Sequence, residues 1–298
     1  MKDKLIYSCF LSFDVEEWFQ VENLKNAISR DDWENKSSTV AENTRKILQI
    51  LKDHDITATF FILGWVAERN PDLVREIHAR GHEIASHGYG HELANNLDDE
   101  MRLKDIIDSR EILESLIQDN IYGYRAPNFS INDNVLAQLA NLGFLYDSSY
   151  NPFKFNRRYG SLDNLGKKLA PACYETAVGI YEIPLSSYNF RNIAFPIAGG
   201  GFFRLIPYFI FQRLVKARLT QEATYNFYLH PWEFEPEQVR IKNIRWDYRF
   251  RHYYGLRHTA QKLEKLILFL KDMRCEFLTI KEYVNRIKVK RETEKSME

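Results

Sequence analysis

The chain has 298 residues, and 41 lysine and arginine residues balance 41 aspartate and glutamate residues, so its formal net charge is zero. That balance argues against a general nucleic-acid binder or a polyanion-seeking protein, because such proteins carry excess basic charge. Hydrophobic residues make up 45% of the chain, which excludes a disordered polypeptide and is enough apolar material for one large globular domain. Single α/β barrels often reach this length.

Neither the cysteines nor the N-terminal residues indicate secretion. Cys9, Cys173 and Cys275 are dispersed and form no C-x-x-C pair, which is typical of free thiols in a reducing compartment. The apolar run at residues 5–11 is short, and acidic residues rather than a small-residue cleavage site follow it. No run approaches the roughly 20 apolar residues that a membrane span needs. We therefore expect a cytoplasmic protein without a transmembrane segment, and a peripheral membrane association stays open.

In the first half of the chain, short apolar runs alternate with stretches of helical spacing, the pattern of βαβ units in a parallel sheet or barrel. A helix is predicted from Thr39, where Glu42 would complete a capping box. Further helix starts are predicted at Asn70, Asp98 and Asn132. The strands predicted between these helices cover residues 6–13, 57–63, 83–86, 121–124 and 144–146.

In the second half the pattern is less regular. Residues 151–179 are predicted to be a loop-rich insertion that could wall a substrate site. A short helix is predicted near the C-terminus, followed by a frayed, charged tail at residues 288–298. We expect one domain over residues 1–287. The other predicted elements are strands at 180–185, 225–229 and 276–278, a glycine-rich turn at 199–201, and helices at 205–219 and 259–272.

The strongest local signal for chemistry is the segment His-Gly-Tyr-Gly-His, from His87 to His91, directly after a predicted strand. Two imidazoles four residues apart can converge on one divalent metal ion, and the two glycines argue against a regular helix. The alternative is a glycine-rich turn whose histidines only form hydrogen bonds with the backbone. Taken alone, the segment supports both interpretations equally.

Other polar residues also follow predicted strands. Asp14 and Glu16 come after the first strand and would share one face, so that one can ligate a metal while the other accepts a proton. His230 follows another strand and could serve as a general acid near neutral pH. Arg125 ends a fourth strand. The alternatives are a solvated strand end for the carboxylates, a satisfied polar residue for His230 and a surface ion pair for Arg125.

In this chain order the motifs resemble the polysaccharide deacetylase family, the carbohydrate esterases of family 4 that share the NodB homology domain. The resemblance covers essentially the whole chain and is closest to a subfamily associated with bacterial exopolysaccharide production, with a C-terminal region like DUF3473. It implies an α/β fold, a single irregular and incomplete (β/α) barrel. The matching motifs are Ser12-Phe13-Asp14, His87 to His91, Arg125-Ala126-Pro127, Leu229-His230-Pro231, the turn at 199–205 and the segment at 252–256.

The resemblance implies a metal-dependent hydrolase that removes N-acetyl groups from an N-acetylated sugar in a polysaccharide or its biosynthetic intermediate. His87, His91 and a carboxylate would hold the metal, with Zn²⁺ favoured and Co²⁺ or Ni²⁺ as alternatives. Asp14 would act as the base, Arg125 would orient Asp14, and His230 would protonate the leaving amine. Relatives of this kind also make a homo-oligomer an open expectation.

Two departures from the family pattern bear on the site. The usual first motif has adjacent aspartates, whereas Val15 follows Asp14 here, so the third protein ligand stays open between Glu16 and Asp14. The segment Tyr-Asp-Ser-Ser at 146–149 matches another family motif only in part, because it lacks the usual tryptophan. On that partial match, Asp147 is assigned as the group that orients His230.

Residues 240–258 interleave six lysine and arginine residues with aromatic residues. Such a segment can bind single-stranded nucleic acid, but the neutral chain disfavours this, and a subsite for an anionic sugar or a subunit interface fits better. Aromatic residues beside the motifs could stack on sugar rings or simply pack at the barrel rim; these are Trp18, Phe19, Tyr89 and Trp232.

Two rival functions follow from the same residues. One is hydrolysis of a cyclic amide or another small C–N bond, as in other members of the superfamily. The second is a catalytically silent carbohydrate-binding relative, which only the irregular first motif favours.

Overall fold

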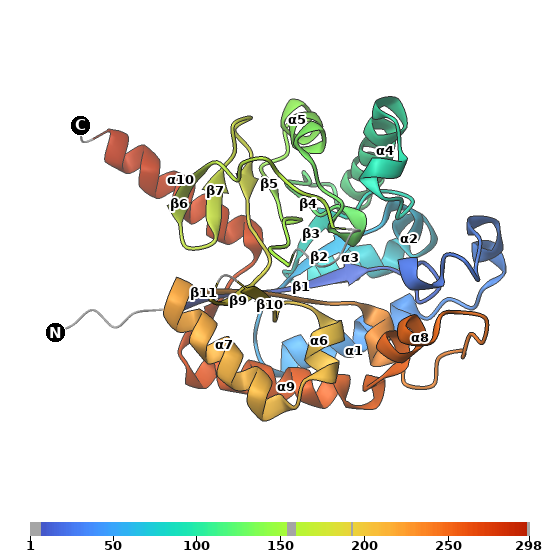
Figure 1. Ribbon diagram of the computed structural model, residues 1–298. Coiled ribbons are helices and arrows are strands. Elements are labelled where there is room, and N and C mark those ends of the chain that lie inside the picture. The colour runs from blue at the N-terminus through green and yellow to red at the C-terminus, as the bar shows by residue number, and fades with distance from the viewer. Residues whose placement is uncertain (1–6, 154–158, 192, 297–298) are drawn as a thin grey trace.

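The computed structural model describes residues 7–153, 159–191 and 193–296 (Figure 1). Its strands are β1 (Tyr7–Val15), β2 (Thr59–Ile62), β3 (Glu83–Ser86), β4 (Gly123–Tyr124), β5 (Tyr146–Asp147), β6 (Lys167–Ala170), β7 (Cys173–Glu175), β8 (Tyr181–Glu182), β9 (Ser187–Phe190), β10 (Ile193–Pro196), β11 (Thr224–Leu229) and β12 (Cys275–Phe277). Its α-helices are α1 (Val40–Asp53), α2 (Gly64–Arg69), α3 (Pro71–Ala79), α4 (Asp99–Ile117), α5 (Asp133–Asn141), α6 (Gly200–Leu205), α7 (Tyr208–Glu222), α8 (Trp246–Tyr253), α9 (Thr259–Asp272) and α10 (Ile280–Lys295).

One large sheet has the strand order β11-β1-β2-β3-β4-β5-β8-β7-β6, and β12 pairs with the start of β1. The strands from β11 to β8 run parallel, whereas β7 and β6 are antiparallel additions at one edge. The central strand β1 is buried along most of its length, because helices cover the outer face of the sheet. The carboxyl ends of the parallel strands therefore meet at one edge, where a site can form.

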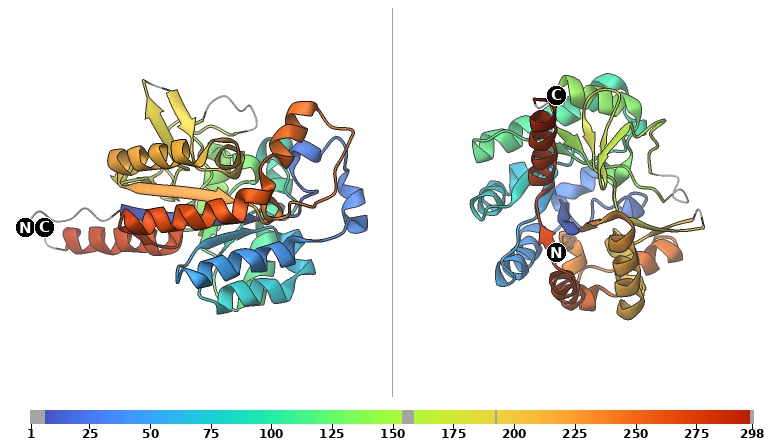
Figure 2. Two further views of the ribbon diagram at one scale, coloured as in Figure 1. Left: turned by 90° about the horizontal axis from the view of Figure 1, so that it is seen from below. Right: turned by 90° about the vertical axis from the view of Figure 1, so that its left-hand side faces the viewer.

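The sheet curls until its two ends approach each other (Figure 2). The N–H of Ser186, just after β8, donates to the carbonyl of Asn226 on β11 over 3.3 Å. In return, the side-chain amide of Asn226 donates to the carbonyls of Ile183 and Pro184. These few bonds replace a regular ladder, so the architecture is the predicted incomplete (β/α) barrel.

Helix α1 begins at the predicted residue but not for the predicted reason. Thr39 precedes the helix without capping it, and its hydroxyl donates to Glu235 over 2.6 Å. The N–H of Thr39 donates to Glu17. The predicted capping box with Glu42 therefore does not form. Glu17 and Glu235, both distant in the sequence, accept the hydrogen bonds of Thr39 instead, and the buried carboxylate of Glu17 is a stronger acceptor than Glu42 would be.

The predicted glycine-rich turn at 199–201 is the start of a helix. Gly199 precedes α6, and a side chain on Gly200 would collide with the carboxylate of Glu233. The helix predicted at 205–219 is α7, which begins three residues later, after Pro207. Proline lacks the N–H that a continuous helix would need there.

The C-terminal region is more regular than predicted. The expected short helix and frayed tail form the 16-residue helix α10, which continues to Lys295. An ion pair of 2.8 Å between Arg291 and Glu175 fastens this helix to β7. The predicted insertion at 151–179 contains the hairpin of β6 and β7, although its residues 154–158, like Ile6 and residues 297–298, lie outside the described part.

Within the described residues, no helix is long and apolar enough to cross a membrane.

Candidate active site

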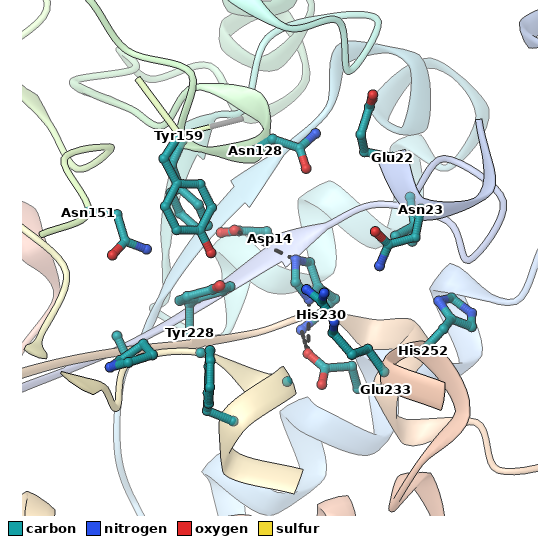
Figure 3. A pocket seen from close by; sticks show the side chains of 18 of the residues that line it. Asp14, Glu22, Asn23, Asn128, Asn151, Tyr159, Tyr228, His230, Glu233 and His252 are labelled. Atoms are coloured by element: carbon teal, nitrogen blue, oxygen red, sulfur yellow. Dashed lines mark hydrogen bonds and ion pairs between the residues drawn. The ribbon is translucent and has the colours of Figure 1, made fainter. Parts of the chain in front are cut away.

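Strand ends bring the predicted site residues to one cavity of about 490 Å³ (Figure 3). Asp14 and Glu16 come from the end of β1, His87 follows β3, and His230 follows β11. Arg125 follows β4 and lies behind Asp14, fully buried. These residues are far apart in the sequence, and the parallel sheet places them side by side.

Three of these groups form a cluster that could hold a metal ion. One ligand atom each from Glu16, His87 and His91 lies within 4.8 Å of the others, and all three residues are buried. Glu16 Oε2 is 2.6 Å from His91 Nε2 but accepts no hydrogen bond in the described structure. The lone pairs of Glu16 Oε2 and His91 Nε2 can therefore face a third atom shared between them. A bound cation would take the place of that third atom.

The protonation states of His87 and Glu16 fit a metal site, whereas at His91 burial lowers the pKa but Glu16 outweighs it and raises that pKa, so a metal would displace a proton from His91. His87 Nδ1 lies 2.7 Å from the carbonyl of Arg125, which fixes the ring so that Nε2 keeps its lone pair. Burial lowers the pKa of His87 to about 4, so its ring is neutral at pH 7. Burial alone would raise the pKa of Glu16, but the neighbouring histidines, His91 first, bring it well below its usual range. A neutral imidazole and an ionised carboxylate are the forms that bind metals.

The loop that carries the two histidines is held by Asp105 of α4. Its carboxylate accepts the backbone N–H groups of Tyr89 and Gly90 at 2.8 and 2.9 Å. Gly88 has a left-handed φ of 74°, and a side chain there would press against Asp105. The loop is thus a tight turn around one half-buried carboxylate, and it presents His87 and His91 to the same point.

A buried arginine orients Asp14. Arg125 Nη1 donates to Asp14 Oδ1 over 2.6 Å and to the hydroxyl of Ser12 over 2.8 Å. Its Nε donates to the carbonyl of Ser148, and its guanidinium lies 4.0 Å from the ring of Phe61. Because so many contacts fix the guanidinium, Asp14 has a single position at the cavity.

His230 is held by Glu233, three residues further along the chain (Figure 3). His230 Nδ1 lies 2.9 Å from Glu233 Oε1, and Nε2 points to the cavity, 3.7 Å from Glu16 and 4.0 Å from Asp14. Arg204 pairs with the other oxygen of Glu233 over 2.6 Å. Burial would lower the pKa of His230, but the three carboxylates outweigh it and raise that pKa to about 9.

Comparison with known proteins shows which family models match parts of the chain. Residues 27–146 match the family model described as polysaccharide deacetylase, and residues 148–285 match a domain of unknown function, DUF3473. Residues 27–146 belong to the polysaccharide deacetylase family. His87, His91 and Arg125 lie in the first match and His230 in the second, so one cavity takes residues from both.

Curated relatives are about one third identical to this chain over a stretch of about 100 residues. A peptidoglycan-N-acetylglucosamine deacetylase of Bacillus cereus is 34% identical over 101 residues, 34% of this chain and 47% of the relative. A chitooligosaccharide deacetylase of Sinorhizobium fredii is 32% identical over 103 residues, again 34% of this chain and 47% of the relative. The chain therefore spans about half the length of these relatives.

Solved structures agree on the polysaccharide deacetylase fold. One from Mycobacterium smegmatis has a TM-score of 0.62 and 21% identity, and the match covers 98% of this chain and 93% of that one. The Xyl-CE4 domain of a multidomain xylanase from the hindgut metagenome of Trinervitermes trinervoides has a TM-score of 0.53 and 14% identity. That match covers 94% of this chain and 91% of that one.

The predicted contact between Asp147 and His230 is wrong, because Glu233 takes that place. Asp147 is fully buried and accepts hydrogen bonds from the hydroxyl and N–H of Ser149. Its other partner is Glu182, which stands directly opposite on β8. In this family member, Asp147 thus lies in the sheet behind Arg125 and away from the histidine.

Aromatic residues near the motifs mostly pack at the barrel rim. Trp18 and Phe19 are buried and make edge contacts with each other, and Phe19 also meets Trp65. Trp232 lines the cavity, stacks on His230 with ring centroids 5.1 Å apart, and donates to Glu16. The tryptophan therefore fixes the site itself, while the first two residues belong to the core.

Sequence reasoning missed four residues of the site. Glu233 had a signal, since a glutamate three residues after a helix-starting residue is a capping pattern, and here it reaches back to His230. Asp105 and Arg204 had none, because their partners are distant in the sequence. Asn128 lines the cavity with a strained φ of 52°, and its buried Nδ2 has no hydrogen-bond partner within the described residues.

Proposed function

We propose that the protein is a metal-dependent hydrolase that removes N-acetyl groups from an N-acetylated sugar in a polysaccharide or its biosynthetic intermediate. The observation that carries the proposal is the convergence on one cavity of a buried two-histidine, one-carboxylate cluster with an oriented carboxylate and an oriented histidine. Deacetylation of an amide needs these parts: an activated water, a base, and an acid for the amine.

Glu16, His87 and His91 would hold the metal. They offer one carboxylate oxygen and two imidazole nitrogens, a donor set that suits Zn²⁺ and also Co²⁺ or Ni²⁺. The carboxylate oxygen of Glu16 that accepts no hydrogen bond favours Glu16 over Asp14, which is engaged by Arg125. When bound, such an ion supplies Lewis-acid chemistry, lowering the pKa of a water towards about 7 and polarising the acetamide carbonyl.

Asp14 serves as the base in this proposal. Its carboxylate removes a proton from the water as the water oxygen bonds to the carbonyl carbon. Arg125 keeps the carboxylate in one position, because the guanidinium is 2.6 Å away and fully buried. The base is therefore ready without any rearrangement.

His230 serves as the acid. As the C–N bond breaks and acetate forms, the sugar nitrogen takes a proton from Nε2, which faces the cavity. An amine leaves poorly without that proton, so the step needs a cationic imidazole. Burial opposes the charge, yet the nearby carboxylates raise the pKa of His230 to about 9 and supply the protonated form at neutral pH.

The substrate would meet an unpartnered amide in the cavity wall. Asn128 lines the cavity, and its Nδ2, buried without a hydrogen-bond partner in the described chain, would donate to an oxygen of the sugar once the side chain turns towards the cavity. We assign Asn128 to substrate binding.

The experiment that tests the function is acetate release from a panel of N-acetylhexosamine oligosaccharides with added zinc, for the wild type and His87→Ala. We expect acetate from the wild type and none above background from the variant. Acetate from neither protein contradicts the proposal and favours the cyclic-amide or the catalytically silent alternative. Acetate at equal rates from both proteins contradicts the role of His87.

We further propose a cytoplasmic location and a role in exopolysaccharide production, as the resemblance implies. All three cysteines are free, and burial raises the pKa of the Cys9 thiol well above its usual value. Free, unreactive thiols fit a reducing compartment. Cell fractionation with an antibody against the chain tests the location, and recovery in the secreted fraction contradicts it.

A further inference from the structure

Helix α8 presents a stripe of exposed aromatic side chains. Trp246 is 82% exposed, Phe250 is 51% exposed and Tyr254, just after the helix, is 45% exposed. The spacing of four residues puts the three rings on one face. We call these three residues the α8 stripe. Exposure of large aromatic side chains to water is costly, so a surface of this kind marks an interaction site.

Basic side chains flank the α8 stripe. Exposed Arg249 lies on one side of the rings and Arg251 on the other, in helical positions. Between residues 240 and 258 there are six lysine and arginine residues and one acidic residue, Asp247. Asp247 neutralises part of this charge through its pairs with Arg245 and Arg251. The segment is strongly positive on a chain whose total charge is zero.

The opposite face of the same helix borders the cavity. Arg245, Tyr248 and His252 line it, together with Phe202 of α6. Figure 1 shows α8 beside α6 at the outer edge of the molecule. The α8 stripe is therefore next to the cavity mouth, and whatever covers the stripe also lies next to the bound substrate.

We propose that the α8 stripe docks on an anionic lipid surface, with its aromatic rings at the level of the lipid headgroups and its arginines on the phosphates. Amphipathic helices with aromatic residues between basic ones bind at this depth, and the attraction grows with the negative charge of the lipid. The docked protein would take its substrate from the membrane surface, since the cavity opens beside the stripe.

The size of the α8 stripe favours a lipid surface over a second protein copy. At about 200 Å² for each aromatic side chain, the exposed part of the stripe amounts to roughly 350 Å². A stable protein interface buries about 800 Å² on each partner. The concentrated positive charge also opposes pairing of this face with its own copy, whereas it complements anionic lipid.

Tryptophan fluorescence reports on this face directly. The chain has five tryptophans, and the other four are at most 8% exposed, so Trp246 dominates any change in solvent contact. With vesicles that contain phosphatidylglycerol, we expect a blue shift of the emission and protection from acrylamide quenching. With vesicles of pure phosphatidylcholine we expect neither, and added salt should reverse the effect. This readout needs no catalytic activity, so it can fail or succeed separately from the proposed function.

Vesicle co-sedimentation tests the residues. The Trp246→Ala/Phe250→Ala double variant should lose binding to phosphatidylglycerol vesicles, and Arg249→Gln should weaken it about fivefold. Phe195→Ala, which removes an exposed ring from β10, is the matched control and should bind as the wild type does. Equal binding by the double variant and the wild type overturns the proposal. Two other results also overturn the proposal. Protection of Trp246 from quenching when only the protein concentration is raised indicates a second copy of the chain, and protection by N-acetylhexosamine oligosaccharides alone indicates a glycan surface.

Discussion

Carboxylates act on His230 from two sides. Glu233 holds Nδ1, while Glu16 and Asp14 face Nε2 across the cavity, and together they raise the pKa of His230 to about 9 against the effect of burial. A cation held by Glu16 offsets the charge of that carboxylate, so in the loaded protein the pKa of His230 moves back towards neutral. The part of the pKa increase that comes from Glu233 remains, because Glu233 lies on the other side of the imidazole ring.

The Glu233→Gln substitution tests how much Glu233 contributes to the raised pKa of His230. Glutamine keeps an acceptor for Nδ1 but removes the charge that raises the pKa of His230. A lower pKa means that the ring loses its proton at a lower pH. We therefore expect the high-pH limb of kcat to move down by about one pH unit. An unchanged limb contradicts the assignment of His230 as the acid, and a melting curve checks that the variant, which leaves Arg204 without its partner, is folded.

The acid and the metal ligand are separable by substitution. His230→Ala should lower kcat by about 10²- to 10⁴-fold and leave the metal content unchanged, because His230 is outside the cluster. His87→Ala should remove the metal as well as the activity. Elemental analysis of both purified variants after incubation with zinc measures this. Loss of metal from the His230 variant would refute the role given to that residue.

At the scale of elements, the histidine loop after β3 depends on helix α4, none of whose residues lines the cavity. Asp105 of α4 accepts two loop N–H groups, and an asparagine side chain can accept only one of them. Asp105→Asn should therefore weaken zinc binding about 10- to 100-fold, the usual effect of a supporting partner. Asp108→Asn, on the same helix and paired with Lys104, is the control and should bind zinc normally. Equal affinities for the two variants would contradict the support role.

Helices α6 and α8 are joined through one buried arginine. Arg204 of α6 pairs with Glu233 and donates to the carbonyls of Arg251, His252 and Tyr254 at the end of α8. Arg204→Met leaves a buried carboxylate and these carbonyls without a partner. We expect the free energy of unfolding to fall by about 3–5 kcal/mol in urea denaturation. Arg213→Met on the exposed side of α7 should change it by less than about 0.5 kcal/mol.

At the scale of the whole molecule, the two buried carboxyl groups of Asp147 and Glu182 make the free energy of unfolding depend on pH. Burial first, and then the charge of Asp147, raises the pKa of Glu182 well above its usual value. Glu182 Oε1 accepts the N–H of Tyr150, while Oε2 is buried without a hydrogen-bond partner in the described structure, so the proton that burial favours is placed on Oε2. The folded protein therefore keeps a proton that the unfolded chain loses above about pH 4.5.

The proton on Glu182 determines whether stability rises or falls with pH. Stability from a raised carboxyl pKa is complete below the unfolded pKa and declines as the pH rises towards the folded pKa. We expect Glu182→Gln, which cannot ionise, to reduce the difference in unfolding free energy between pH 5 and pH 8, by up to about 1.4 kcal/mol per pH unit of the raised range. The exposed Glu42→Gln is the control. Parallel pH dependences in the wild type and Glu182→Gln would contradict the assignment.

Local patterns were sufficient to locate the strands and the residues at their ends. The His87 to His91 segment, Asp14 and His230 all follow apolar runs that the structure shows as β3, β1 and β11. One error arose where distant partners compete with a local one, and another where a partial motif match suggested the wrong partner. Thr39 bonds to Glu235 instead of capping its helix, and Asp147 faces its neighbour on β8 instead of His230. Such partners are not visible in nearest-neighbour patterns.

The sequence by itself determined the class of fold, the family and the types of residue at the site, because strand and helix periodicity and strand-end chemistry are local properties. The tertiary structure alone decided which groups meet. The parallel pairing of β11 with β1 puts His230 within 4.0 Å of Asp14, although the two residues are 216 positions apart and no local rule connects them. It also selected Glu233 and Asp105 as the supporting carboxylates, since charge interactions in a buried site depend on distance and burial rather than on sequence separation.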